Sequence, residues 1–258
     1  MQVNFFFIEL FFSIRQFFNK IRKPNIKLIL IDLDGTILKD FSTLEEGLKI
    51  IYGKKTGAKR YSKVMTMIIN KEATAEDLMI HAENQLIDGK FSKNTLAQIN
   101  KKMIKKIDYS LIKAIKDNVS NKKIIVATKS SNVLAYNIAK RFSFFSGVGT
   151  NLAFHKNGLM KKSLFLVSDH NKIYGGHKFR TKLELAIDCY KAHEGQINEK
   201  EVAIITDAIT DLNTMKKCGL TILVKGKKPN VLQLICEKYK LYDILIQSEQ
   251  DYSKLKQI

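Results

Sequence analysis

Several residue types are scarce in this 258-residue chain, and each scarcity excludes a class of protein. The three cysteines (Cys189, Cys218 and Cys236) are odd in number, far apart and in no Cys-x-x-Cys frame, which argues against a disulfide scaffold or a zinc site. Tryptophan is absent, but 45% hydrophobic and 27% charged residues exclude a disordered, collagen-like or multi-span membrane chain. We expect a globular protein with a sizeable core in a reducing compartment, the cytoplasm.

Acidic residues are few: 44 Lys and Arg stand against 25 Asp and Glu, so the net charge is +19. A basic surface attracts phosphate-bearing partners such as nucleic acid, anionic lipid or small phosphoesters. The lysines are scattered in ones and twos, however, and the abundance of Lys, Ile and Asn is typical of an A/T-rich genome. We therefore favour compositional bias and expect no nucleic-acid partner.

The first 23 residues form an apolar segment of their own. Ten of the sixteen residues 3–18 are large and apolar, and only Glu9 and Arg15 are charged. The run is too short and interrupted for a transmembrane helix, and it lacks the basic start and cleavage site of a secretory signal. Two uses fit a helix here: packing on the body of the protein, or peripheral membrane contact through residues 3–23 with Arg15, Lys20, Arg22 and Lys23 toward lipid phosphates.

After residue 24, short apolar runs alternate with helix-like stretches. Four runs have the length of strands that are buried on both faces: 28–31, 124–127, 202–205 and 220–224. A repeated order of strand and helix predicts a parallel sheet covered on both sides, which is an α/β fold.

Two long inserts interrupt this alternation. Residues 40–120 contain several helix-like stretches, and Thr74-Ala75-Glu76-Asp77 resembles a helix start, so we expect a helical cap domain. The second insert, 151–176, carries Asn157-Gly158 between two apolar stretches, which predicts a hairpin. The expected organisation is an apolar segment, an α/β core in two parts and a cap: 1–23, 24–39 with 121–258, and 40–120.

Polar residues follow three of the four runs, at the strand ends where such sheets bind ligands. Asp32-Leu33-Asp34-Gly35-Thr36 follows the first run, and two carboxylates so close together need a cation or hydrogen bonds to offset their repulsion. Thr128 follows the second run, and the N–H groups of Lys129-Ser130-Ser131 are expected to begin a helix and seat a phosphate. The third run leads into Thr206-Asp207-Ala208-Ile209-Thr210-Asp211.

These positions predict a metal site and a cation for a substrate phosphate. An all-oxygen set suited to Mg²⁺ would consist of Asp32, Asp207, Asp211 and the carbonyl of Asp34. Lys178, with Lys182 as the alternative, lies between the second and third strands, where a cation could reach the same phosphate. No pair of histidines has ligand spacing, so we interpret these as surface or core residues: His155, His170, His177 and His193.

In this order and at these spacings, the motifs resemble the four motifs of the haloacid dehalogenase (HAD) superfamily of phosphatases, over residues 27–224. Further similarity in 74–89, Gly149-Thr150-Asn151-Leu152 and Gly175-Gly176-His177-Lys178 resembles the phosphoserine phosphatase-like subgroup, which has a helical C1-type cap. The resemblance implies a Rossmann-like parallel sheet with an inserted all-helical cap, and Mg²⁺ as cofactor.

The resemblance also implies a role for each site residue. Asp32 would be the nucleophile that forms an aspartyl-phosphate, and Asp34 the general acid that protonates the leaving oxygen and then acts as base on water. Asp34 can do so only if its neighbours raise its pKa. Thr128 and Lys178 would bind the phosphoryl oxygens. The last motif, usually Gly-Asp-Ser, is Thr206-Asp207-Ala208 here, which predicts a bulkier metal loop.

We therefore expect a Mg²⁺-dependent phosphomonoester hydrolase acting on a small phosphorylated metabolite. A lipid-phosphate phosphatase at a membrane surface is the first alternative, suggested by the apolar start. An idle HAD-like binding protein is the second, and a nucleic-acid 3′-phosphatase would rest on charge alone. Candidate substrate contacts in the cap are Glu45, Glu46, Lys59 and Arg60.

Overall fold

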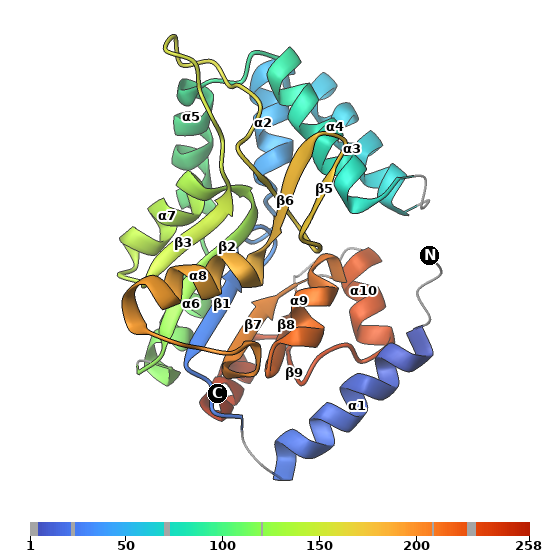
Figure 1. Ribbon diagram of the computed structural model, residues 1–258, viewed down its shortest axis with the longest axis vertical. Coiled ribbons are helices and arrows are strands. Elements are labelled where there is room, and N and C mark those ends of the chain that lie inside the picture. The colour runs from blue at the N-terminus through green and yellow to red at the C-terminus, as the bar shows by residue number, and fades with distance from the viewer. Residues whose placement is uncertain (1–4, 22–23, 70–72, 120, 208, 226–230) are drawn as a thin grey trace.

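A parallel β-sheet forms the centre of the molecule. The computed structural model describes residues 5–21, 24–69, 73–119, 121–207, 209–225 and 231–258. Within these ranges, six strands pair in parallel in the order β3-β2-β1-β7-β8-β9 (Figure 1). The strands are β1 (Leu28–Asp32), β2 (Lys123–Ser131), β3 (Ser146–Thr150), β7 (Val202–Thr206), β8 (Leu220–Val224) and β9 (Ile244–Ile246). The predicted α/β class is confirmed.

The central strands are apolar on both faces because helices cover both sides of the sheet. Every residue of β1, β7 and β8 is buried, and the four apolar runs of the sequence coincide with these strands and β2. The edge strands were not predicted, because β3 is glycine-rich and β9 has only 3 residues. Side-chain alternation along β1 sends Leu28 and Leu30 into one core and Ile29 and Ile31 into the other.

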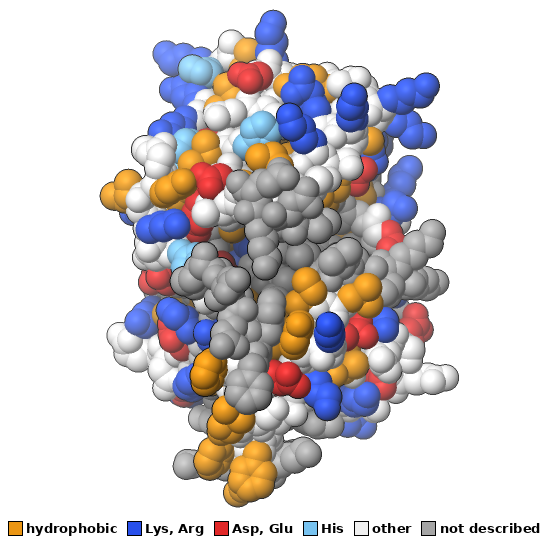
Figure 2. Space-filling model, turned by 90° about the vertical axis from the view of Figure 1, so that its right-hand side faces the viewer, with side chains coloured by type: hydrophobic (Ala, Val, Ile, Leu, Met, Phe, Trp, Pro, Cys, Tyr) orange, Lys and Arg blue, Asp and Glu red, His pale blue; other side chains and the backbone are white. Residues whose placement is uncertain are grey.

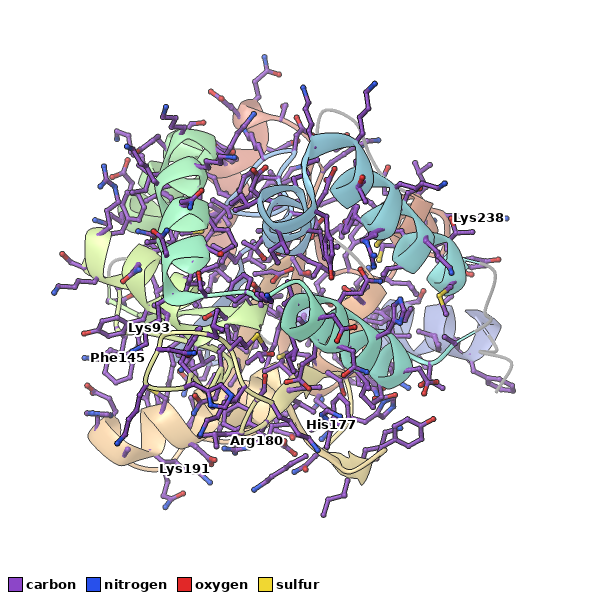
Figure 3. All side chains as sticks on the ribbon, turned by 90° about the horizontal axis from the view of Figure 1, so that it is seen from above. Lys93, Phe145, His177, Arg180, Lys191 and Lys238 are labelled. Atoms are coloured by element: carbon purple, nitrogen blue, oxygen red, sulfur yellow. The ribbon has the colours of Figure 1, made fainter. Side chains whose placement is uncertain are left out.

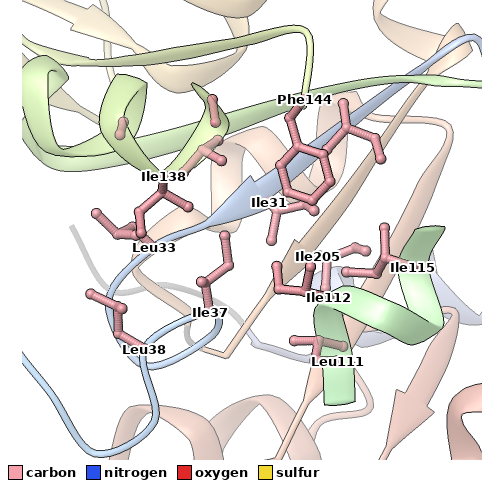
Figure 4. Packing of buried hydrophobic residues seen from close by; sticks show 14 of the residues in the cluster. Ile31, Leu33, Ile37, Leu38, Leu111, Ile112, Ile115, Ile138, Phe144 and Ile205 are labelled. Carbon is pink, nitrogen blue, oxygen red and sulfur yellow. The ribbon is translucent and has the colours of Figure 1, made fainter. Parts of the chain in front are cut away.

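Helices from distant parts of the chain form the two outer layers. They are α6 (Tyr109–Asn118), α7 (Asn132–Arg141), α8 (Lys182–Glu194), α9 (Leu212–Lys217) and α10 (Val231–Lys238). Short 3₁₀ segments complete this part: η2 (Glu199–Glu201), η3 (Ile209–Asp211) and η4 (Glu249–Gln257). Figure 4 shows Leu111, Ile112 and Ile115 of α6 beside Ile31 and Ile205 of the sheet, all in one buried cluster. Since α6 covers the sheet, we propose that the cap ends before it and that α6 is part of the core.

The cap lies above the carboxyl ends of the strands (Figure 1). It contains α2 (Thr43–Tyr52), α3 (Lys54–Ile69), α4 (Ala75–Asp88), α5 (Lys93–Met103) and the 3₁₀ turn η1 (Ile104–Lys106). The helix start predicted at Thr74 is confirmed: Thr74 Oγ1 accepts from the Asp77 N–H at 3.1 Å, and Asp77 Oδ2 accepts from the Thr74 N–H at 2.9 Å. These reciprocal bonds satisfy two N–H groups that the helix leaves unpaired.

A small second sheet lies beside the cap, in the order β4-β6-β5. Its strands are β4 (Leu166–Ser168), β5 (Lys172–Tyr174) and β6 (His177–Thr181). The turn predicted at Asn157-Gly158 is present: Gly158 has φ +81°, and Phe154 pairs antiparallel with Met160. Two buried carboxylates of α4 reach this region, since Glu83 Oε1 accepts from the Ser163 N–H at 2.5 Å and Glu76 Oε1 from Ser168 Oγ at 3.0 Å.

Helix α1 (Phe5–Ile21) packs on the body of the protein, near α9 and β9 (Figure 1). Ile8 and Phe12 are buried in one of the two cores. The expectation that Arg15 faces lipid phosphates is wrong, because its guanidinium is buried and pairs with Asp243 at 2.5 Å. Residues 1–4, 22 and 23 of the apolar segment lie outside the described residues.

The outward face of α1 is apolar. Figure 2 shows hydrophobic side chains along the lower part of the face that α1 occupies. The exposed large residues are Phe7, Leu10, Phe11, Ile14, Phe17, Phe18 and Ile21. Among the described helices, none combines the length and hydropathy that a bilayer crossing requires.

Candidate active site

The loop after β1 carries Asp32 and turns sharply at Gly35. Asp32 is the last residue of β1, and its Oδ1 accepts a hydrogen bond from the Leu33 N–H at 2.8 Å. Gly35 has φ +82°, and a Cβ there would lie 2.2 Å from Asp207 Oδ2. Glycine at this position therefore lets the loops after β1 and β7 come into direct contact.

Asp34 is held by the first residue of α2. Its Oδ2 accepts hydrogen bonds from Thr43 Oγ1 at 2.6 Å and from the Thr43 N–H at 3.2 Å. Its Oδ1 is buried and has no hydrogen-bond partner in the described part of the chain. Burial raises the pKa of Asp34 to about 7, aided by the carboxylate of Asp32 and opposed by the bonds from Thr43. A carboxyl with such a pKa can hold a proton near neutral pH and donate it.

The lysine beside the aspartates is Lys182, and the prediction of Lys178 is corrected. The Lys182 ammonium lies 2.6 Å from Asp32 Oδ1 and 2.9 Å from Asp211 Oδ2. Burial lowers the pKa of Lys182, but the carboxylates of Asp211 and Asp32 outweigh it and raise the pKa above its ordinary value. Lys178 is exposed because side chains alternate along β6, and His177 and Phe179 take the buried positions. Figure 3 views the molecule from the cap side and marks β6 by His177 and Arg180.

Asp207 and Asp211 follow β7 and complete the acidic cluster. Asp207 Oδ1 accepts from Thr36 Oγ1 at 3.3 Å, and Asp211 Oδ2 accepts from Thr206 Oγ1 at 2.9 Å. Burial, together with the carboxylates of Asp32 and Asp211, raises the pKa of Asp207 to about 8. Burial also opposes ionisation of Asp211, but the ammonium groups of Lys182 and Lys129 keep its pKa below the usual range.

Thr128 and the residues after it lie at the same edge, in a different conformation from the expected one. β2 continues to Ser131 with an irregular register after Ala127, so the N–H groups of residues 129–131 do not begin α7. Thr128 is buried, and its Oγ1 accepts from the Ser130 N–H at 3.0 Å. The Lys129 ammonium donates to the Thr210 carbonyl and lies 3.7 Å from Asp211 Oδ1, which adds a second cation to the cluster.

The sequence change at the start of the last motif has a structural role. Thr206 is fully buried at the end of β7 and donates its hydroxyl to Asp211, so its extra bulk lies inside the core. Ala208, the other departure from the expected motif, lies outside the described residues.

The charge and chemistry of this cluster fit a hard divalent cation. The site holds four carboxylates, those of Asp32, Asp34, Asp207 and Asp211. Among the described residues that line it, only Lys129 and Lys182 carry positive charge to balance them. Lys182 bridges Asp32 and Asp211. In the described ranges, no group of three or more His, Cys, Asp or Glu side chains has metal-site geometry. The donors are nevertheless all oxygen atoms, which Mg²⁺ prefers as ligands. A bound Mg²⁺ would also offset the repulsion between carboxylates that helps to raise the pKa of Asp207.

A cavity of about 450 Å³ opens above the cluster, between the sheet edge and the cap. Asp32, Asp34, Thr128, Lys182 and Asp207 form its floor. Glu45 is on the cavity wall, but Glu46 pairs with Lys102 at 2.5 Å instead. Lys59 and Arg60 are exposed residues of α3, and the Arg60 guanidinium lies 4.1 Å from the centre of the Tyr52 ring. Of the four candidate cap contacts, only Glu45 is therefore among the cavity-lining residues.

Comparison with known proteins identifies the fold. No family model and no curated protein matches the chain. Among solved structures, a HAD family hydrolase from Salmonella enterica serovar Typhi aligns with TM-score 0.66 and 12% identity over 91% of this chain and 76% of its own. A phosphoserine phosphatase, solved as a phospho-aspartyl intermediate analogue, aligns with TM-score 0.63 and 17% identity over 87% and 94%. A phosphoserine phosphohydrolase-like protein from Francisella tularensis aligns with TM-score 0.65 and 15% identity over 89% of this chain and 99% of its own.

These likenesses establish the architecture of the chain. It has the fold of the HAD hydrolases, and its neighbours include phosphoserine phosphatases, as the sequence motifs predicted. The topology brings Asp32, Asp34, Thr128, Asp207 and Asp211 to one edge of the sheet.

Sequence reasoning missed two participants of the site. Thr43 had no recognisable signal, because its bond to Asp34 depends on how the cap is placed over β1. Lys129 is predicted to contribute only its backbone N–H to a phosphate seat, but its ammonium group lies beside Asp211, and a lysine directly after Thr128 at a strand end is a signal for such a cation.

Proposed function

We propose that the protein is a Mg²⁺-dependent phosphomonoester hydrolase that works through an aspartyl-phosphate. The observation that carries the proposal is the pairing of Asp32, fixed by Lys182, with Asp34, whose pKa of about 7 suits an acid and base at neutral pH. Both lie on the floor of a cavity, on a fold shared with phosphatases. The retained acids favour an enzyme over an idle binding protein.

In the first step, Asp32 attacks the phosphorus atom of the substrate. Both hydrogen bonds to its carboxylate from described residues end on Oδ1, so Oδ2 supplies the electron pair for the new O–P bond. As the bond from phosphorus to the leaving oxygen breaks, protonated Asp34 donates its proton to that oxygen, and the alcohol leaves. Thr128 and Lys182, which line the cavity, would bind the phosphoryl oxygens.

In the second step, Asp34, now a carboxylate, removes a proton from water. The water oxygen attacks the phosphorus atom, the bond to Asp32 breaks, and inorganic phosphate is released while Asp34 regains its proton. Asp32, Asp207, Asp211 and the carbonyl of Asp34 would hold Mg²⁺, which offsets negative charge on the phosphoryl group when bound.

The proposal is tested by phosphate release from a panel of phosphomonoesters in the presence of Mg²⁺ or EDTA. We expect Asp32→Asn to abolish turnover, and Asp34→Asn to slow it by about a hundredfold or more, as loss of a general acid and base does. Mass spectrometry should detect a phosphorylated Asp32 peptide in the parent protein. Turnover by Asp32→Asn at the rate of the parent would refute the mechanism.

We also propose that the apolar segment, residues 3–23, makes peripheral contact with an anionic membrane surface. Support comes from the exposed apolar face of α1 and the net charge of +19. In vesicle flotation, replacing Phe17 and Phe18 by Ser should weaken binding about tenfold or more, because each buried phenylalanine is worth about 1.5–3 kcal/mol. Ile173→Ser, an exposed apolar residue of β5, is the matched control and should leave binding unchanged. Equal binding by all three proteins would end this proposal.

A further inference from the structure

The cavity has a charged floor and predominantly apolar walls. The floor is the acidic cluster with its two lysines, and the walls rise from it toward the cap. Six apolar side chains line the walls and are only partly buried: Phe41, Leu44, Met65, Met79, Leu86 and Leu152. Such surface is covered favourably by an apolar ligand and unfavourably by water.

The apolar wall is assembled from several elements of the cap and the core. Leu44 is in α2, Met65 in α3, and both Met79 and Leu86 are in α4, whereas Leu152 follows β3. Methionine adapts its shape readily, so the three methionines that line the cavity suit a flexible chain better than a rigid polar group. A group entering from the floor would therefore meet carbon atoms on several sides.

Three carboxylates lie on the cap side of the cavity: Asp40 is exposed, whereas Glu45 and Glu83 have partners. Glu45 pairs with Lys49 at 2.6 Å, and Glu83 accepts the Ser163 N–H while lying 3.1 Å from His177 Nδ1. In the described lining, the only cationic residues are Lys129 and Lys182, and both are drawn to Asp211. A carboxylate on the alcohol part of a substrate would thus enter the wall region without a counter-ion, which is costly.

We infer that the substrate is a phosphomonoester whose alcohol part is uncharged and apolar, such as an alkyl or acyl chain. This inference rests on the proposed phosphatase function and names the substrate class of the same site. The phosphate lies on the floor beside Asp32, and the chain extends between Met65 of α3 and Leu86 of α4. Amino-acid phosphates, which carry an ammonium and a carboxylate, are poor substrates for such walls.

The first experiment compares methyl, butyl, hexyl and octyl phosphate, all as monomers, with O-phosphoserine. We expect kcat/KM to rise about fourfold per methylene until the walls are covered, the factor that corresponds to about 0.8 kcal/mol per buried methylene. O-phosphoserine should fall at least about tenfold below butyl phosphate, because its charges must lose water. A preference for O-phosphoserine, or rates independent of chain length, would overturn the inference and leave the phosphatase function standing.

A matched pair of variants on α3 tests the wall itself. Met65 lines the cavity, whereas Met67, two residues further along the same helix and also partly buried, does not. Met65→Gln should lower kcat/KM for octyl phosphate about fivefold or more and leave methyl phosphate unchanged, which also shows that the variant folds. Met67→Gln should change neither. Equal effects of both variants on octyl phosphate would contradict the assignment of the wall.

Binding without turnover separates this inference from the proposed function. Asp32→Asn, which cannot form the intermediate, is titrated calorimetrically with methylphosphonate and octylphosphonate. Octylphosphonate should bind at least about a hundredfold more tightly and with a negative heat-capacity change, the mark of apolar burial. If the parent hydrolyses no ester while this preference holds, the function fails and the apolar site stands. If the two phosphonates bind equally, the apolar site fails.

Two further assays decide whether the apolar substrate is a soluble ester or a membrane lipid. One offers octyl phosphate as monomers, and the other offers phosphatidic acid in phosphatidylcholine vesicles. Faster turnover of the vesicle lipid assigns a membrane lipid, and turnover of the monomer alone assigns a soluble ester. Failure to hydrolyse either, with O-phosphoserine hydrolysed, would refute the apolar substrate class.

Discussion

Lys182 joins Asp32, the proposed nucleophile, to Asp211, in the loop after β7, through two ion pairs made by one ammonium group. Its side chain is 3% exposed, and its partners Asp32 and Asp211 are 10% and 1% exposed. Removing one member of such a buried group leaves the others without compensation, which is far costlier than losing a surface ion pair. In the proposed reaction, a substrate phosphate would replace one or both of these ion pairs, and the Lys182 ammonium would then offset the negative charge of the phosphate.

We therefore expect substitution of Lys182 to reduce activity strongly and substitution of Lys178, four residues earlier, to have little effect. Lys182→Met should reduce phosphate release by about a hundredfold or more, because it removes a preorganised cation from the site. Lys178→Met, at an exposed position of β6, should stay within about twofold of the parent and change stability by less than about 0.5 kcal/mol. Phosphate-release kinetics measure the first effect, and thermal unfolding shows that both variants fold. Loss of activity in Lys178→Met alone would show that the wrong lysine has been assigned.

Much of the candidate site could be predicted at the residue scale, because its acids follow strand-like runs. Asp32, Asp34, Thr128, Asp207 and Asp211 each stand at or near the end of an apolar run, and parallel strands bring those ends together. The lysine could not be chosen this way, because Lys178 lies in β6 and Lys182 begins α8, so the choice depends on which face of β6 is buried and on where the strand ends. The sequence pattern of residues 172–182 gave no sign of either.

At the element scale, helix α1 is attached by a buried polar anchor as well as by apolar packing. The Arg15 guanidinium pairs with Asp243 and also donates to Thr221 Oγ1 at 2.9 Å and to the Met215 carbonyl at 2.6 Å. Burial raises the pKa of Asp243, and the Arg15 charge opposes that shift. The helix therefore depends on one side chain that reaches into the space between α9 and β9.

Arg15→Ala should lower the free energy of unfolding by about 3 kcal/mol, since it leaves a buried carboxylate unpaired. Urea unfolding followed by circular dichroism measures this, because the chain has no tryptophan for fluorescence. Ser13→Ala, at an exposed position of the same helix, is the control and should cost less than about 0.5 kcal/mol. Adding Asp243→Asn to Arg15→Ala should recover part of the loss. A change of under about 1 kcal/mol in Arg15→Ala would mean that apolar packing alone holds the helix.

At the scale of the whole molecule, the acidic cluster couples folding to pH and to metal. Burial raises the pKa of Asp34 to about 7 and that of Asp207 to about 8, both well above the ordinary value of 3.8. A carboxyl whose pKa is raised on folding binds its proton more tightly in the folded state. Its stabilising contribution is therefore complete below about pH 4 and is lost as pH rises through the folded-state values.

The metal-free protein should accordingly lose several kcal/mol of stability between about pH 4 and pH 8. Mg²⁺ should restore it most at the alkaline end, because it binds the ionised carboxylates of the folded state only. Thermal unfolding with EDTA or Mg²⁺ across this range provides the measurement, and Asp207→Asn should flatten the pH dependence of the EDTA samples. Stability that rises toward pH 8 in EDTA would contradict the assigned burial of these acids.

By itself, the sequence determined the alternation of strands and helices, the class of fold and the order of the acidic motifs, because these follow from local periodicity and from the positions of polar residues after apolar runs. Only the tertiary structure decided that Lys182 pairs with Asp32, that Arg15 turns inward, that α6 covers the sheet and that the cavity walls are apolar. Each of those outcomes depends on contacts between segments far apart in the chain, whose relative placement no local pattern encodes.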